Sequence, residues 1–467
     1  STNNFLGLGE TLTVQANIGS LQRDIVFGFT EPYLFDRPLT AGFTVYGRKL
    51  RYDQARQAAL ITGTVLNVSE AQLQSLQNYT QSSKGFSLTA SYPLPRRFGF
   101  GKRVGATYSY DVSSLIALTT ASKNLFQFLA FSGISGPNAL NGIVTSKIFL
   151  EYDKNTLDAG LFPHSGTKYF LGADISGLGG TVRTIRPIFD YQHFFPVQNR
   201  RNTIGVHFQG TFLTGYGGLV APPFQRSYMG GENDIRGFDI RSVSPVAFLP
   251  TASAVPLRNP DGSIVPRNPN LPAGSNNQYT VPVPIDQITF PGGDLGLTAN
   301  AEYRITIAGP VAIAPFFDLG FDPILRRSQL RINNGQFALI NSTLFGCPQQ
   351  DPITFRCIGG KNFPFSQELQ VLSSGNWQPR ASTGLELQMF LPVINAPFRI
   401  YWAYNPLRMD QVSHSPVPIT RDMFPPCPGP LCGAGDYTFQ LTRNTFSPDY
   451  RLREPRKTFR FTVGTTF

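Results

Sequence analysis

The stretch ETLTVQANIGSLQRDIVFGFTEP, from Glu10 to Pro32, shows most clearly how this chain folds. In its first half, Leu, Val, Ala and Ile alternate with Thr, Gln and Asn, and a similar run follows after a very short turn. An alternation with a period of two predicts a β-strand with one apolar face and one polar face. The stretch therefore predicts two neighbouring strands joined by a tight turn.

The same alternation recurs along the whole chain, in about fourteen runs that are mostly ten to twelve residues long. Runs of this length match the roughly 9–11 residues that a tilted strand needs to cross a bilayer. A soluble β-sandwich would bury the same apolar face, so the alternation alone does not separate the two classes. The runs are 10–19, 23–32, 39–50, 85–94, 102–112, 144–153, 166–177, 184–195, 202–213, 294–307, 311–321, 380–392, 398–406 and 456–467.

The connections between the runs alternate between short and long, and this pattern separates the two classes. Short turns at one end of the strands and long loops at the other are typical of outer-membrane barrels. Loops this long are uncommon inside a compact soluble domain. The sequence therefore predicts one all-β, transmembrane antiparallel β-barrel over residues 1–467, with no long amphipathic helix. Its long extracellular loops are expected at 51–83, 113–143, 214–293, 322–379 and 407–455.

Composition and motifs narrow the function classes. Only 15% of the residues are charged, below the ~25% of ordinary soluble domains, while 13% are aromatic. The net charge is +11, but the basic residues are scattered, which favours anionic lipid head groups or a basic interior wall over nucleic acid. Common enzyme motifs such as G-x-S-x-G, H-E-x-x-H and the Walker loop are absent from the sequence. We therefore expect no enzyme activity, no cofactor and no metal.

Four cysteines fall in two close pairs within Pro/Gly-rich segments, Cys347 with Cys357 and Cys427 with Cys432. Neither pair has the C-x-x-C spacing of a zinc site, and no histidine cluster lies nearby. The spacing predicts two local loop disulfides, which form in an oxidising compartment.

The motif RSYMGGENDIRGF, Arg226–Phe238, lies near the start of the longest predicted loop. Gly230, Gly231 and Gly237 allow the backbone to approach a wall closely. Arg236, followed by Gly237 and Phe238, needs an acidic acceptor if it is held away from bulk water. The motif therefore predicts that this part of the loop dips into the lumen. An exposed arginine without a fixed partner is the alternative.

The alternation of side chains along the strands predicts which carboxylates accept hydrogen bonds from Arg236. Glu302 shares the polar face of its strand with Asn300 and Arg304, and Asp318 points away from its apolar neighbours Phe317 and Leu319. The two strands after the loop therefore each present an inward carboxylate. We expect Arg236 to pair with Asp318, Glu302 or both. The carboxylates within the motif, Glu232 and Asp234, are weak candidates for catalysis because no partner or pocket motif accompanies them.

Several of these stretches resemble the barrel of the BamA family of outer-membrane assembly factors. They are FTEPYLF (29–35), the L-D-x-G-x-F-P-x-x-G turn (157–166), the loop motif GGENDIRGF (230–238), FFDLG (316–320) and the terminal FRFTVGTTF (459–467). The resemblance implies a sixteen-stranded barrel preceded by periplasmic POTRA domains, with the loop arginine held by acidic wall residues. This sequence begins where the third strand of the family is expected, so the first hairpin and the POTRA domains are expected upstream. A fourteen-stranded barrel is the alternative.

The last run has outward aromatics, Phe459, Phe461 and Phe467, and Gly464 near its end, where a glycine weakens strand pairing. The resemblance implies that this strand closes against the first through a poor seam. Such a seam opens sideways, and a client strand then adds to its edge by β-augmentation. An ordinary closing strand with a chance glycine is the alternative.

The resemblance implies an insertase that folds other β-barrel proteins into the outer membrane of a Gram-negative bacterium. Its expected partners are outer-membrane lipids and lipopolysaccharide, unfolded outer-membrane protein clients and accessory periplasmic lipoproteins. The alternatives are a TamA-like factor or a two-partner-secretion translocator, and a passive porin, against which the loop motif argues.

Overall fold

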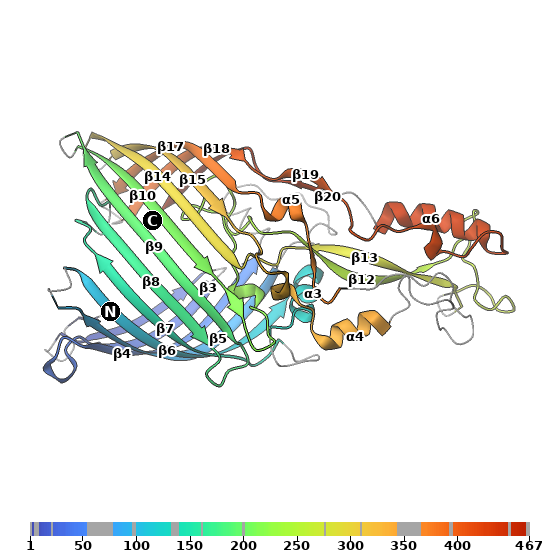
Figure 1. The fold of residues 1–467 in the computed structure, drawn as a ribbon, viewed down its shortest axis with the longest axis horizontal. Helices are drawn as coiled ribbons and strands as arrows, with labels where there is room; N and C mark the ends of the chain where they lie inside the picture. The colour runs from blue at the N-terminus through green and yellow to red at the C-terminus, as the bar shows by residue number, and fades with distance from the viewer. Residues whose placement is uncertain are drawn as a thin grey trace.

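A computed structural model describes residues 2–3, 9–19, 22–53, 78–95, 100–131, 140–159, 162–198, 201–274, 277–308, 311–342, 366–391, 396–446 and 450–463. Its main feature is one large antiparallel sheet, curved into the barrel wall on the left of Figure 1. Neighbours in the sheet are also neighbours in the chain, apart from the elements inserted in the long loops. The predicted all-β barrel class is confirmed.

Fourteen long strands form the wall, and each coincides with one of the alternating runs of the sequence. Two two-residue strands, β1 (Thr2–Asn3) and β11 (Thr214–Gly215), also pair with this sheet. The long strands are β2 (Thr11–Ile18), β3 (Gln22–Glu31), β4 (Thr40–Asp53), β5 (Asn78–Pro93), β6 (Lys102–Ala117), β7 (Ile143–Asn155), β8 (Gly166–Ser176), β9 (Thr184–Val197), β10 (Asn202–Phe212), β14 (Leu295–Ala308), β15 (Val311–Phe321), β17 (Arg380–Leu391), β18 (Ala396–Leu407) and β21 (Lys457–Val463).

The alternation of the sequence becomes an inside and an outside of the wall. On β14, Leu297 and Ile305 are 42% and 37% exposed, whereas Glu302 between them is 3% exposed. Lipid solvates the outward apolar face, and the inward polar face is covered by the loop residues that fill the lumen. Among the described residues, no helix is both long enough and apolar enough to cross a membrane.

The long loops contain more regular structure than the sequence predicts. The loop between β10 and β14 contains a hairpin, β12 (Ala247–Pro256) and β13 (Thr280–Thr289), and β12 also pairs with β16 (Gln370–Val371). This hairpin projects from one end of the barrel, as Figure 1 shows. The β13 sequence TVPVPIDQIT carries two prolines, which lack the N–H that a central strand needs. They are tolerated because β13 lies at the edge of its small sheet.

Helices also occur in these loops, whereas the sequence predicts no long amphipathic helix. The longest helix among the described residues is α6 (Cys432–Phe446), which lies beside the β12–β13 hairpin in Figure 1 and shares an apolar core with it. The sequence does not predict α6, because two glycines lie in its first turn and threonines interrupt its apolar face. The described residues also contain α3 (Thr120–Phe128), α4 (Asn334–Ser342) and α5 (Ser373–Asn376). A short antiparallel pair is formed by β19 (Asp410–Ser413) and β20 (Tyr450–Arg453).

Candidate functional site in the barrel lumen

Arg236 lies inside the barrel with 1% of its surface exposed and meets the wall at Asp318 on β15. Its Nε and Nη2 donate to the two carboxylate oxygens of Asp318 at 2.8 and 2.7 Å, and its backbone N–H donates to the same carboxylate at 3.0 Å. This two-pronged geometry is the strongest form of an arginine–carboxylate contact. The loop backbone and its side chain are therefore both held by one wall residue.

Two further carboxylates complete the arginine site. Nη1 of Arg236 donates to Glu302 at 3.4 Å and to Glu386 at 3.2 Å, and both side chains are fully buried. The guanidinium also stacks over the ring of Phe316, 3.8 Å from its centroid. Glu302 was predicted from strand parity, whereas Glu386 on β17 was missed. Glu386 lies on the same inward face of β17 as Ser382 and Gln388. The alternation of side chains would have predicted it if the argument had included this third strand after the loop.

The register of the wall brings these residues together. Asn300 on β14 is directly opposite Asp318 on β15, and its amide donates to Asp318 at 3.0 Å and to the backbone carbonyl of Asp234 at 2.7 Å. The amide therefore holds both the wall carboxylate and the loop in place. Strands β14, β15 and β17 are consecutive in the sheet, so their inward side chains converge on one patch of the lumen.

The buried charges of this patch balance. Arg236, Arg304 and Arg399 contribute three guanidinium groups, and Asp318, Glu302 and Glu386 contribute three carboxylates. Arg399 donates to Glu386 at 2.6 and 2.7 Å, and Arg304 donates to Glu302. A paired and hydrogen-bonded set of this kind avoids the cost of an isolated buried charge.

The patch also reaches the predicted L-D-x-G-x-F-P turn at the short-turn end of the barrel. Arg304 donates through Nη1 to the carbonyl of Pro163 at 3.1 Å. Within the turn, Asp158 accepts from the backbone N–H of His164 at 2.9 Å and from the Ser165 hydroxyl at 3.1 Å. The two sequence motifs are thus joined through Glu302 and Arg304.

The loop motif touches the last strand as well as the middle of the wall. Thr458 and Arg460 on β21 donate to the carbonyls of Gly237 and Phe238 at 2.7 and 3.0 Å, and Arg460 also forms an ion pair with Asp239. Asn405 on β18 donates to the Gly237 carbonyl at 2.9 Å. This contact with β21 was not anticipated, because strand parity alone does not reveal which inward residues a loop reaches.

The glycines of the motif occupy backbone conformations that side chains rarely adopt. Gly230 and Gly231 both have φ of 109°, and Gly237 has φ of 89°. A Cβ on Gly230 would lie 2.2 Å from the Asp239 carbonyl oxygen, so the chain turns back on itself there. Phe238 is fully buried and packs with Met229, Ile235 and Val243 in a small apolar core. These contacts fix the motif in one conformation.

Gly237→Ala is expected to destabilise the barrel by roughly 2–4 kcal/mol, since it adds strain at positive φ to a clash. The new Cβ would lie 2.4 Å from Asn405 Oδ1 and 2.9 Å from the Ala403 Cβ. The measurement is the urea midpoint of the folded protein in detergent. Gly262→Ala is the matched control, because it has φ of 85° but open space around it. Equal midpoints for the two variants would contradict the close approach to β18.

Asp234 gives the site a pH dependence. Burial raises its pKa to about 6, and electrostatic interactions with His207 and Arg241 oppose this shift. Because this pKa lies above the unfolded value of 3.8, protonated Asp234 favours the folded state below pH 3.8, and this stability is lost as pH rises from 3.8 to about 6. We expect Asp234→Asn to leave stability unchanged near pH 3, below both pKa values, and to raise it by roughly 1–3 kcal/mol at pH 8. Urea midpoints at the two pH values test this, and no pH dependence of the difference would contradict it.

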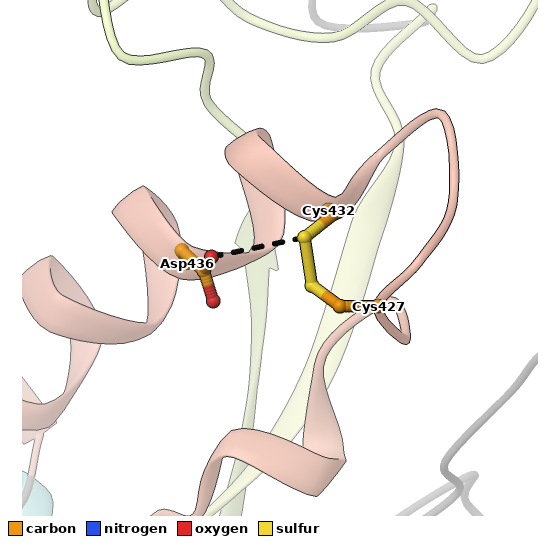
Figure 2. Close-up of side chains that lie close together, drawn as sticks. All are labelled: Cys427, Cys432 and Asp436. Atoms are coloured by element: carbon orange, nitrogen blue, oxygen red, sulfur yellow. Dashed lines mark hydrogen bonds between the residues drawn. A yellow bond between two sulfur atoms is a disulfide. The ribbon is translucent and has the colours of Figure 1, made fainter.

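Of the predicted disulfides, one lies within the described residues. Cys427 and Cys432 are bonded at the start of α6, and Figure 2 shows Asp436 beside them. These three residues are the one group in the described part of the chain whose Cys, His, Asp or Glu atoms gather closely enough to hold a metal. The sulfurs are in a disulfide and not thiolates, and thiolates are what zinc binds. Cys347 and Cys357 lie outside the described residues.

The outward aromatics of the last strand are placed as predicted from parity. Phe459 and Phe461 are 70% and 69% exposed, and Arg460 between them faces the lumen at 3%. Phe461 stacks on Phe398 of the neighbouring β18, with ring centroids 6.5 Å apart. Gly464 and Phe467 lie outside the described residues, so the expected weak strand end remains a prediction.

Comparison with known proteins bears on this barrel as a whole. The model of the Omp85 superfamily domain matches residues 4–467. The outer membrane protein assembly factor BamA of Nitratidesulfovibrio vulgaris is 22% identical over 326 residues, which cover 68% of this chain and 31% of that protein.

Two solved structures are also similar. One is BamA from Haemophilus ducreyi lacking POTRA domains 1–3, with a TM-score of 0.55 at 14% identity over 98% of this chain and 66% of that one. The other is CdiB from Acinetobacter baumannii, with a TM-score of 0.43 at 12% identity over 87% and 52% of the two chains. The first likeness supports the fold. The chain thus spans less than two thirds of the length of these relatives.

Proposed function

The chain belongs to the Omp85 superfamily and lies in the bacterial outer membrane, and from this premise we propose that it inserts other β-barrel proteins into that membrane. At the level of the family, the comparisons support insertion or translocation of outer-membrane proteins. The observation that favours insertion here is the contact between the lumen loop and the last strand, where Thr458 and Arg460 donate to the loop carbonyls.

In this proposal the loop motif braces one side of a seam. The sheet order begins with β1 and β2 and ends with β21, and no pairing joins these two ends within the described residues. In the described part of the chain, β21 pairs with β18 alone. Such an end strand offers unpaired N–H and C=O groups as a template for an incoming strand.

The Arg236 site gives this seam a rigid support. Five wall strands, β14, β15, β17, β18 and β21, contact residues 232–239 of the loop through hydrogen bonds. With these strands held as one unit, the sheet can part at its ends without losing its shape. Insertion would then proceed by strand addition, without covalent chemistry, a cofactor or a metal.

The partners proposed with this function are unfolded outer-membrane proteins, membrane lipids and accessory periplasmic lipoproteins. A translocator that passes an unfolded chain through the lumen is the second candidate, since relatives of both kinds exist in the family. The filled lumen argues against this use of the pore, because Arg236, Phe238 and the wall carboxylates that hold Arg236 are buried there. The loop would have to leave the lumen before a chain could cross.

Depletion of the protein in its own host separates the two functions. If it is an insertase, many different outer-membrane β-barrel proteins should disappear from the membrane fraction together, and their unfolded forms should accumulate in the periplasm. The measurement is quantitative proteomics of purified outer membranes during depletion, with an unrelated outer-membrane lipoprotein as the control. Loss of one secreted protein, with normal levels of the other barrels, would support the translocator instead.

A further inference from the structure

A groove of about 530 Å³ runs along the outward face of the wall over β9, β10, β14 and β15. Its lining is almost entirely apolar, and its volume lies in the range of ordinary ligand sites. Trp377, which follows α5, forms the wall of the groove nearest the long loops, and its ring lies 6.2 Å from that of Phe321. The residues that matter for the argument are Phe189, Phe208, Gly210, Leu297, Ala299 and Trp377.

The strand registers explain why the groove exists. One outward row crosses the wall as Phe189, Gly210, Leu297 and Phe321, and the next as Tyr191, Phe208, Ala299 and Leu319. Gly210 lacks a side chain and Ala299 has a single methyl group, and these two positions are diagonal neighbours. Large apolar side chains surround them on both sides. The result is an apolar channel across this part of the wall.

Arginines stand at the long-loop end of this groove. Arg326 lies with its guanidinium 5.3 Å from the ring centroid of Phe212, the next outward residue after Gly210 on β10. Arg326 also donates to the hydroxyl of Thr214. Thr214 is opposite Ile185 in the sheet, and this places Arg183, two residues before Ile185, at the same end of the wall. Arg183, Arg326 and the adjacent Arg327 are exposed, and none of them forms an ion pair within the described residues.

The carboxylate of Asp294 binds the backbone of the segment that carries Arg326 and Arg327. Asp294 accepts from the backbone N–H groups of Leu325 and Arg326 at 2.6 and 3.0 Å, and it is 1% exposed. It therefore fixes the segment that carries the arginines and does not neutralise their side chains. The site combines an apolar channel at membrane depth with unpaired positive charge at the membrane surface.

We propose that this groove binds one phosphorylated lipid of the outer leaflet with the chemistry of lipid A, an acyl chain in the channel and its phosphates against Arg326, Arg327 and Arg183. Guanidinium groups bind phosphate through paired, charge-assisted hydrogen bonds. Phosphates attached to a sugar close to the acyl chains suit three arginines at the mouth of a single channel. An acyl chain needs no hydrogen bonds from the groove, and the lining offers almost no polar groups.

Native mass spectrometry of the full-length protein in detergent, titrated with diphosphorylated lipid A, tests this proposal. One copy should bind tightly to the wild type. Arg326→Gln/Arg327→Gln should weaken that copy by roughly tenfold or more, the change expected from losing a charge-assisted contact. Gly210→Leu/Ala299→Leu should abolish it by filling the channel; a Cβ on Gly210 meets only Leu297, at 3.2 Å, so the wall can accept a side chain there.

Matched controls separate the site from general effects. Ala301→Leu adds the same side chain at the next outward position of β14, outside the groove. Arg267→Gln/Arg451→Gln removes the same charge from exposed positions elsewhere. Both should bind as the wild type does, and every variant should show the wild-type shift between folded and unfolded bands on a gel. Unchanged binding in the site variants, equal loss in the controls, or equal binding of dephosphorylated lipid A or phosphatidylglycerol would overturn the proposal.

Discussion

Arg236→Ala is expected to destabilise the folded barrel by roughly 3–5 kcal/mol, the usual cost of breaking a buried ion pair from one side. The substitution leaves Asp318, Glu302 and Glu386 buried with one positive charge fewer. The measurement is the urea midpoint of the protein folded in detergent, together with the amount of folded protein in the outer membrane. Arg453→Ala is the control, because its side chain is 58% exposed and its ion pair spans 3.9 Å, so it should change stability by less than about 1 kcal/mol.

The exchange variant tests the pairing itself. Asp318→Arg combined with Arg236→Asp should recover part of the stability that each single change loses, because the opposite charges are again adjacent. Full recovery is not expected, since the backbone N–H of residue 236 also donates to the Asp318 carboxylate in the wild type. A double variant no more stable than the worse single variant would show that the two side chains do not act as a pair.

Glu386→Gln should have the second largest effect, again roughly 3–5 kcal/mol. Glu386 is fully buried and accepts from two guanidinium groups, those of Arg399 and Arg236. The amide keeps the shape of the side chain but removes the charge that balances these arginines, and its NH₂ group has to face at least one donor. The same urea measurement applies.

Asp410→Asn is the matched control for Glu386→Gln. It removes one carboxylate charge from an ion pair with Arg408, but Asp410 is 36% exposed and water can solvate what remains. We expect a change below about 1 kcal/mol. If Glu386→Gln lowered the free energy of unfolding by no more than Asp410→Asn does, the buried charge balance would not contribute to the stability of the wall.

Much of the wall and part of the site follow from the sequence, because a strand has a period of two and the connections differ in length. The inward positions of Glu302 and Asp318 follow from that period alone. Glu386 obeys the same rule, but the prediction considered only the two strands after the loop. The contact of Arg460 with the loop could not be predicted, since it depends on how far the loop extends around the barrel.

The elements within the long loops were missed for local reasons. Strand β13 was not predicted because it contains prolines at 282 and 284, which are compatible with a strand only at the edge of a sheet. The sequence does not show that β13 is an edge strand, since this depends on tertiary pairing. Helix α6 was not predicted because the glycines at 433 and 435 have low helix propensity. Its stability comes from packing on the hairpin and from the adjacent disulfide. In both elements, tertiary contacts outweigh local propensity.

The most direct test of the proposed insertion is the folding rate of an unfolded β-barrel client in liposomes that contain the full-length protein. Folding is followed by the gel shift of the client, with liposomes that contain an unrelated porin as the control. We predict faster folding with the wild type than with the porin, and loss of most of this gain in Arg236→Ala protein that has itself folded. A client that folds no faster than in the porin liposomes would contradict the proposal that this barrel inserts others.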